Sequence, residues 1–325
     1  MINNNNNAII ILDSCEELGK KIAEKLDGHL IRIKCKFSKF GNSEINLFPC
    51  DSVRGKKVFI VGSGSNTNAT VNDNIMAMLG MIRACRDASA DQITLVCTYF
   101  PYARSDKKDQ GRAPIMGKLV CDLFKEAGAF RIITFDLHSA QVQGFFNGPF
   151  DNLYAGKDLI KCIKSDYPND KFIVISPDVG GLKRIQDFSC QLNNAEYTFL
   201  VKSRDHNEIS CITSHELVHK LKLENVVCVL VDDIGDTFGT LNSAAEILRK
   251  NGATKVITAI THGVFSGNAL NNLNNNNIDQ VYVTNTLPQT CNCEKIKLVD
   301  VSNTCANALL CCINSVSIST LFDIN

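Results

Sequence analysis

Two adjacent carboxylates followed by small residues form the most informative motif of the chain. Asp232 and Asp233 follow the apolar, β-branched segment 226–231, which predicts a buried strand, and the segment 241–250 has helical spacing. Residues 237–240 are therefore expected at a helix N-terminus, where unpaired N–H groups and the helix dipole favour a phosphate. The carboxylates can accept hydrogen bonds from sugar hydroxyls. The motif predicts a sugar-phosphate site, and an ordinary capped β-to-α loop is the alternative.

A sheet has to position this motif, and the hydrophobic pattern of the chain predicts one. Short apolar runs alternate with longer amphipathic stretches, which is typical of parallel strands joined by crossover helices. The pattern restarts near residue 152, so we expect an α/β protein with two similar domains, each a mainly parallel sheet flanked by helices. The domains are expected over residues 1–152 and 153–325, and the final residues could pack back on the first domain. Strands are expected at 8–12, 58–61, 93–97, 132–135, 172–175, 226–231, 256–260 and 281–283, and helices at 16–26, 74–88, 117–127, 156–164 and 241–250.

Polar segments follow three of the predicted strands directly, at residues 136–138, 177–181 and 232–240. Ligands of parallel α/β sheets bind at the carboxyl ends of the strands. These segments are therefore the candidate binding residues.

The composition narrows the class of ligand. The chain has 325 residues with 34 basic and 34 acidic side chains, so no excess charge favours nucleic acid or an acidic membrane as partner. No apolar run approaches the length of a membrane span. The 15 cysteines contain no CxxC pair, follow no signal-peptide pattern and lie largely in strand-like or helical segments, as do Cys97, Cys121 and Cys228. We expect a cytoplasmic protein with reduced core thiols and a small metabolite as ligand.

A short pattern indicates a different chemistry. Residues 215–219 read His-Glu-Leu-Val-His, and on a helix this spacing would place two imidazoles on one face to hold zinc beside a carboxylate base. A pattern with two free positions arises readily by chance. Metalloprotease activity is therefore the weaker hypothesis.

Several longer motifs, in one order along the chain, resemble the ribose-phosphate pyrophosphokinase family. The first is the polar loop 99–115, which carries four cations and few residues that could pack. The others are DLHSAQVQGFF from Asp136, DNLYA from Asp151, SPDVGG from Ser176, VDDIGDTFGT from Val231 and THGVFSG from Thr261. The resemblance implies a phosphoribosyltransferase-like fold. It also implies transfer of the diphosphoryl group of ATP to the anomeric hydroxyl of ribose 5-phosphate, giving phosphoribosyl pyrophosphate and AMP for nucleotide biosynthesis.

The resemblance implies roles for individual residues as well. The ribose 5-phosphate residues would be Asp232, Asp233, Asp236, Thr237, Gly239 and Thr240, in agreement with the reading of the carboxylate motif. The Mg²⁺ ligands would be His138 and Asp178. The ATP-binding residues would be Phe40, Asn42, Glu44, Arg104 and Asp106, with Phe40 rather than Phe37 against the adenine. The catalytic cations would be Lys202, Arg204, Arg104, Lys107 and Lys108, the last three on a mobile loop that also holds Arg112 and folds over the polyphosphate.

Regulation and assembly are expected by the same analogy. The residues that resemble the regulatory region are Ser52, Arg54, Gln143, Ser317, Ser319 and Phe322, which implies phosphate and ADP as effectors. The family assembles as dimers stacked into hexamers, so a homo-oligomer is expected. Ser105 departs from the family, whose members often carry a longer amide there, and Ala140 stands where many carry a serine.

Two rival functions share part of the pattern. A phosphoribosyltransferase has the same carboxylate motif but lacks the paired lysines of the loop and the motifs at His138 and Asp178. A non-catalytic regulatory subunit associated with the synthetase carries insertions or losses in the loop, which is unbroken here. The sequence therefore favours an active enzyme.

Overall fold

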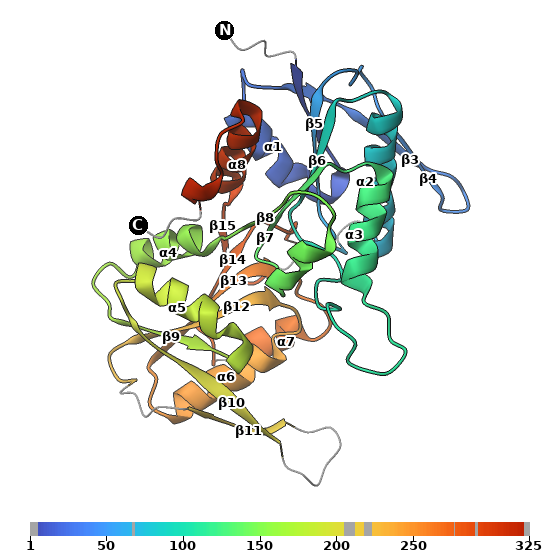
Figure 1. The fold of residues 1–325 in the computed structure, drawn as a ribbon. Helices are drawn as coiled ribbons and strands as arrows, with labels where there is room; N and C mark the ends of the chain where they lie inside the picture. Colours follow the sequence, from blue (N-terminus) through green and yellow to red (C-terminus); the bar gives the residue numbers. More distant parts are fainter. Residues whose placement is uncertain are drawn as a thin grey trace. The chain divides into compact units, whose positions relative to one another are not determined.

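The computed structural model of the chain describes residues 6–66, 69–204, 212–217, 223–275, 277–289 and 292–321. The chain divides into two units, each built around its own sheet (Figure 1). Unit 1 comprises Met1–Tyr154, Thr286–Pro288 and Val301–Asp323, and unit 2 comprises Ala155–Asn285, Gln289–Asp300 and Ile324–Asn325.

Unit 1 contains a six-stranded sheet in which all neighbouring strands are parallel, in the order β2-β1-β5-β6-β7-β8. Its strands are β1 (Asn7–Ile11), β2 (Ile31–Ile33), β5 (Lys57–Gly62), β6 (Gln92–Cys97), β7 (Arg131–Phe135) and β8 (Phe150–Leu153). Helices α1 (Glu16–Lys25) and α8 (Ser302–Asn314) pack together on one face, and α2 (Val71–Asp87) and α3 (Met116–Ala127) on the other (Figure 1).

The central strands are apolar on both faces because helices cover both faces. Val58 and Ile60 of β5 belong to a buried cluster with Met78 of α2, whereas the alternating residues Phe59 and Val61 are buried on the other face. Along these strands the side chains alternate between the two helical layers.

A two-stranded antiparallel hairpin of β3 (Cys35–Lys39) and β4 (Ile45–Pro49) extends from unit 1 beside α2 (Figure 1). Lys39 Nζ lies 3.4 Å from the carboxylate of Asp73, and Asp73 forms a capping box with Thr70 at the start of α2. The capping box fixes the first turn of α2, and the ion pair connects the hairpin to it.

Unit 2 contains a seven-stranded sheet in the order β11-β10-β9-β12-β13-β14-β15, in which only the β10/β11 pair is antiparallel among the described strands. Its strands are β9 (Phe172–Ser176), β10 (Glu196–Arg204), β11 (Ile212–Leu217), β12 (Val227–Gly235), β13 (Lys255–Gly263), β14 (Gln280–Thr284) and β15 (Ile296–Val299). Helices α4 (Gly156–Asp166) and α5 (Leu182–Gln191) pack together, as do α6 (Gly239–Lys250) and α7 (Ala269–Asn274).

The expectation of an α/β fold with two mainly parallel sheets flanked by helices is confirmed. Every predicted strand and helix is present, with ends shifted by a few residues. The elements that the pattern did not predict are β2, β3, β4, β8, β10, β11, β15, α5, α7 and α8. No helix in the described part of the chain is long and apolar enough to cross a membrane.

The cysteines of the described residues are free thiols. Cys97, Cys121 and Cys228 are buried, and burial raises the pKa of the Cys121 thiol to about 12 and that of Cys228 to about 11. The expectation of core thiols does not extend to every cysteine, because Cys50 and Cys190 are exposed.

Candidate active site

The two carboxylates of the central motif lie within strand β12, which corrects their expected place after its end. β12 continues to Gly235 because β13 is equally long and provides partners, with Asp232 opposite Ile260 and Gly235 opposite Gly263. The Asp232 side chain is 26% exposed and that of Asp233 is 4% exposed. A carboxylate as buried as Asp233 requires a compensating charge.

Arg184, near the start of α5, provides this charge. Its Nη1 atom lies 3.4 Å from Oδ1 of Asp232 and 3.4 Å from Oδ1 of Asp233. The backbone N–H of Asp233 also donates to Asp232 Oδ1 at 2.9 Å. Burial, followed by repulsion from Asp233, raises the pKa of Asp232 well above its ordinary value, and Arg184 opposes that rise. The arrangement holds two acceptors side by side.

Sequence reasoning missed Arg184. Two adjacent carboxylates near the end of a buried strand require a nearby cation. This requirement is the one sequence feature that could have predicted a residue such as Arg184. The segment that carries Arg184 was not predicted to be helical, so nothing placed this side chain beside β12.

We expect the change Arg184→Met to destabilise unit 2 by about 2 kcal/mol. This is less than the roughly 3–5 kcal/mol for breaking a fully buried pair, because Arg184 and Asp232 are each about a quarter exposed. Urea denaturation followed by circular dichroism would measure the change. The matched control is Lys183→Met, which removes the same charge from the exposed neighbouring position. Equal stability of the two variants would show that the ion pairs contribute nothing.

The turn between β12 and α6 presents the start of the helix as expected. Phe238 occupies the N-cap position with φ of +60°, and its side chain offers no acceptor to the first N–H groups of α6. Thr237 and Thr240 are exposed there, and Gly239 is half-buried. Gly239 N donates to Thr237 Oγ1 at 3.5 Å, a long hydrogen bond. The N–H groups of the first turn and the positive end of the helix dipole favour an anionic oxygen.

Side chains that follow β13 hold the turn between β12 and α6 in place. The Phe238 ring stacks on the Phe265 ring with centroids 5.1 Å apart. A Cβ atom at Gly235 would lie 2.7 Å from the Phe238 ring, so only glycine fits there. Asn272 donates to the Thr237 carbonyl at 2.8 Å, and the Ser266 hydroxyl donates to the Asp236 carboxylate. The conformation of the turn is therefore set before any ligand binds.

The two expected metal ligands lie in different units, His138 in unit 1 and Asp178 in unit 2. Asp178 follows β9 and is half-buried; its Oδ1 accepts from Gly180 N at 2.9 Å, which leaves Oδ2 for a ligand. His138 follows β7 and is exposed, in a turn where Leu137 N donates to Asn152 Oδ1 at 3.0 Å. Mg²⁺ usually takes one or two carboxylates together with substrate phosphates and waters, so the Asp178 oxygen fits this ion and the imidazole is a less usual partner.

The expected mobile loop lies between β6 and α3, and its residues 104–115 form neither helix nor strand. Lys107, Lys108 and Arg112 are exposed, and Lys107 Nζ lies 3.8 Å from the Asp109 carboxylate. Arg104 is also exposed and Asp106 is half-buried.

Ser105 closes the base of this loop. Its hydroxyl accepts from Met116 N at 3.2 Å and lies 3.5 Å from the Pro114 carbonyl, and its own carbonyl accepts from Gly117 N at 3.1 Å. Ser105, which replaces the longer amide expected at this position, therefore joins the two ends of the loop.

The expected adenine-binding residues lie in the turn of the β3–β4 hairpin. Phe40 is 58% exposed, and Asn42 and Glu44 are exposed beside it. Phe40 N donates to the Glu44 carbonyl at 2.8 Å, and Asn42 Oδ1 accepts from Glu44 N at 3.2 Å. An aromatic ring left this open to solvent is available to stack on a flat ligand.

Lys202 and Arg204 lie in β10, and their side chains are outside the described residues. The backbone of Lys202 pairs with that of His215 in β11. His215 and Glu216 are thus in a strand, whereas the zinc motif requires them on a helix, and His219 lies outside the described residues. This backbone does not support the metalloprotease hypothesis.

The expected regulatory residues form three local groups within unit 1. Ser52 Oγ accepts from Arg54 N at 3.4 Å, and Arg54 Nη1 donates to Ser89 Oγ at 3.4 Å. Gln143 donates to the Ala140 carbonyl at 3.0 Å. The two C-terminal hydroxyls, those of Ser317 and Ser319, lie 2.8 Å apart, and Phe322 lies outside the described residues.

Comparison with known proteins gives consistent matches along the chain. Residues 7–128 match the family model of the N-terminal domain of ribose phosphate pyrophosphokinase, and residues 222–323 match that of the phosphoribosyl synthetase-associated domain. Ribose-phosphate pyrophosphokinase A of Dictyostelium discoideum is 43% identical over 310 residues, which cover 94% of each chain. The crystal structure of phosphoribosylpyrophosphate synthetase from Mycobacterium smegmatis matches with a TM-score of 0.87 and 34% identity, over 96% of this chain and 100% of that one.

Proposed function

The chain belongs to the ribose-phosphate pyrophosphokinase family and acts in phosphoribosyl pyrophosphate synthesis, and we propose that it transfers the diphosphoryl group of ATP to the anomeric hydroxyl of ribose 5-phosphate, releasing AMP. The observation that carries this proposal is the end of β12. There, two carboxylates held by Arg184 precede a helix N-terminus whose N-cap has no side-chain acceptor.

Each part of the sugar phosphate has a counterpart in this region. The 5-phosphate would bind the first N–H groups of α6 together with the hydroxyls of Thr237 and Thr240, with Gly239 allowing close approach. The ring hydroxyls would donate to Asp232 and Asp233. Asp236, whose carboxylate accepts from Ser266, would complete the site. Holding the sugar at both ends limits the positions of its anomeric hydroxyl, which lowers the entropic part of the barrier.

The polyphosphate needs positive charge, which comes from the basic residues. Lys202 and Arg204 would stabilise charge that develops on the transferring group, and Arg104, Lys107 and Lys108 would close over it. Mg²⁺, when bound through His138 and Asp178, would supply further charge neutralisation on the polyphosphate. The purine would stack on Phe40 beside Asn42 and Glu44, and Asp106 would help to bind the nucleotide.

The identity of the nucleotide product tests the reaction. Purified protein with magnesium, ATP and ribose 5-phosphate is expected to release AMP and phosphoribosyl pyrophosphate in equal amounts, because diphosphoryl transfer breaks the bond between the α- and β-phosphates. Chromatography separates AMP from ADP, and a reaction without ribose 5-phosphate is the control. Release of ADP alone would contradict the proposal.

Regulation, assembly and location extend the proposal by analogy with the family. Phosphate and ADP would act as effectors through Ser52, Arg54, Gln143 and the C-terminal serines Ser317 and Ser319. The protein would be a cytoplasmic homo-oligomer built from dimers, such as a hexamer. A non-catalytic associated subunit is not favoured, because the loop 104–115 is unbroken and keeps its cations. The domain division near residue 152 would then place the nucleotide residues and the sugar-phosphate residues on separate domains.

A further inference from the structure

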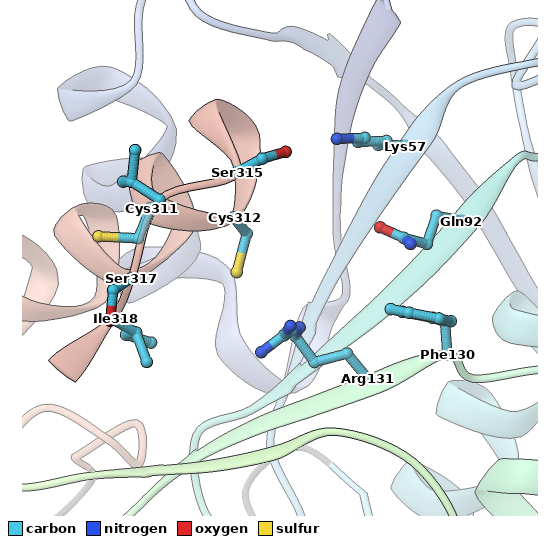
Figure 2. Close-up of a pocket in the computed structure, with 10 residues that line it drawn as sticks. Lys57, Gln92, Phe130, Arg131, Cys311, Cys312, Ser315, Ser317 and Ile318 are labelled. Atoms are coloured by element: carbon cyan, nitrogen blue, oxygen red, sulfur yellow. The ribbon is translucent and has the colours of Figure 1, made fainter.

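Unit 1 contains a cavity with three polar side chains in its lining, at the end of its sheet opposite to His138. Lys57, Gln92 and Arg131 are the first residues of β5, β6 and β7, whereas His138 follows the carboxyl end of β7. These three side chains line a cavity of about 420 Å³ together with the end of α8 and the segment 315–318 (Figure 2). The volume is within the range of roughly 300–1,000 Å³ that is typical of small-molecule sites.

The strand register explains why three polar side chains meet there. Lys57 pairs with Gln92, and Arg131 pairs with Thr94, two residues further along β6. Because side chains alternate along a strand, all three lie on one face of the sheet. On this face α8 ends at Asn314, so the helical layer stops and leaves a space over the strand ends.

The charge of the cavity favours an anion. Arg131 forms an ion pair with Asp151, whereas no carboxylate in the described part of the chain forms an ion pair with Lys57. Two cations therefore face one carboxylate. The α8 carbonyls nearby are partly satisfied, since Cys311 O accepts from Val316 N at 3.0 Å. Interaction of Lys57 with the negative end of the helix is the simpler alternative.

The two cations of the cavity are directed at different parts of its wall. Figure 2 shows the Lys57 ammonium directed toward Ser315 and the Arg131 guanidinium directed toward the Cys312 thiol, with the Gln92 amide between the two cations. Phe130 and Ile318 add apolar surface to the lining. A tetrahedral oxyanion can accept from several donors at once, and a ring could pack against the apolar surface.

We propose that this cavity binds a small phosphorylated metabolite, with its phosphate on Lys57, Gln92 and Ser315. The site is separate from the residues assigned to the reaction and shares only Ser317 with the expected regulatory residues. It lies within unit 1 and does not depend on the proposed function.

Protection of Cys312 from alkylation tests the site directly. Burial raises the pKa of this thiol, so its reaction with iodoacetamide should be slow enough to time by peptide mass spectrometry. Inorganic phosphate and phenyl phosphate would be compared at equal ionic strength, with the exposed Cys50 as internal reference. We expect both to slow the alkylation of Cys312 and not that of Cys50. Stronger protection by phenyl phosphate would identify a ring-bearing ligand, and equal protection would identify free phosphate.

Variants distinguish binding from an indirect effect. In Lys57→Met the phosphate concentration for half-protection should rise about tenfold, because a hydrogen bond from a charged group is lost. The matched control, Lys56→Met, removes the same charge from the neighbouring residue, which does not line the cavity. Absence of protection in the parent protein, or equal protection in the two variants, would overturn the proposal.

Discussion

Replacing both Lys202 and Arg204 by methionine is expected to lower the turnover number by about two to three orders of magnitude for each cation if the two act independently. The reason is that a cation directed at charge developing on the transferring group interacts more strongly with the transition state than with bound ATP. The KM for ATP and for ribose 5-phosphate should change much less than the turnover number. Steady-state kinetics of AMP release would measure both.

The matched control for this pair is Lys161→Met with Lys171→Met, which removes two charges at exposed positions of the same unit. Its turnover number should equal that of the parent. Near-normal turnover in the Lys202 and Arg204 double variant would assign the catalytic charge to other residues, first to Lys107 and Lys108 of the loop. A parallel loss of thermal stability in that variant alone would instead indicate a structural role in β10.

The sequence predicts the buried strands well because burial on both faces leaves a continuous apolar run. β5, β6, β9 and β12 were all expected on that basis. Strands β3 and β15 have half-exposed or polar residues, so no apolar run marks them. The sequence of β3, for example, is Cys-Lys-Phe-Ser-Lys. Helix α8, Ser302–Asn314, is rich in small residues and cysteine, and its hydrophobic periodicity is weak.

The candidate site was predictable where chain neighbours build it and not where distant elements meet. The turn from Asp236 to Thr240 follows from local sequence, since the residue types at a strand-to-helix junction determine its chemistry. The position at which β12 ends depends on β13, because its pairing with β12 continues to Gly235. The charge balance of the carboxylates depends on Arg184, which lies 48 residues before Asp232. The cavity at Lys57 depends on strand register and on the end of α8, neither of which a single sequence reveals.

Replacing Asp232 and Asp233 by asparagine is expected to weaken ribose 5-phosphate binding by roughly two to four orders of magnitude if the two losses add. Hydrogen bonds to charged groups contribute about 1.5–3 kcal/mol each, which corresponds to roughly 10- to 100-fold in affinity. Isothermal titration calorimetry would measure binding of the sugar phosphate and, separately, of ATP, whose affinity should change by no more than a few-fold. The control Asp170→Asn with Glu196→Gln removes two exposed charges of unit 2 and should bind both ligands normally.

The pH dependence of that affinity separates ligand binding from a structural role of the carboxylates. The folded-state pKa of Asp232 is raised by burial and by Asp233, so its ionised form is lost at a higher pH than for an ordinary aspartate as the pH falls. The parent protein should therefore lose affinity for ribose 5-phosphate as the pH drops through that raised pKa, and the asparagine variant should not show this loss. Ionisation of the ligand phosphate near pH 6 affects both proteins alike, so the difference between the two profiles isolates the carboxylates. Identical profiles, with lower stability in the variant, would mean that the pair holds β12 against α5 through Arg184 and does not bind the sugar.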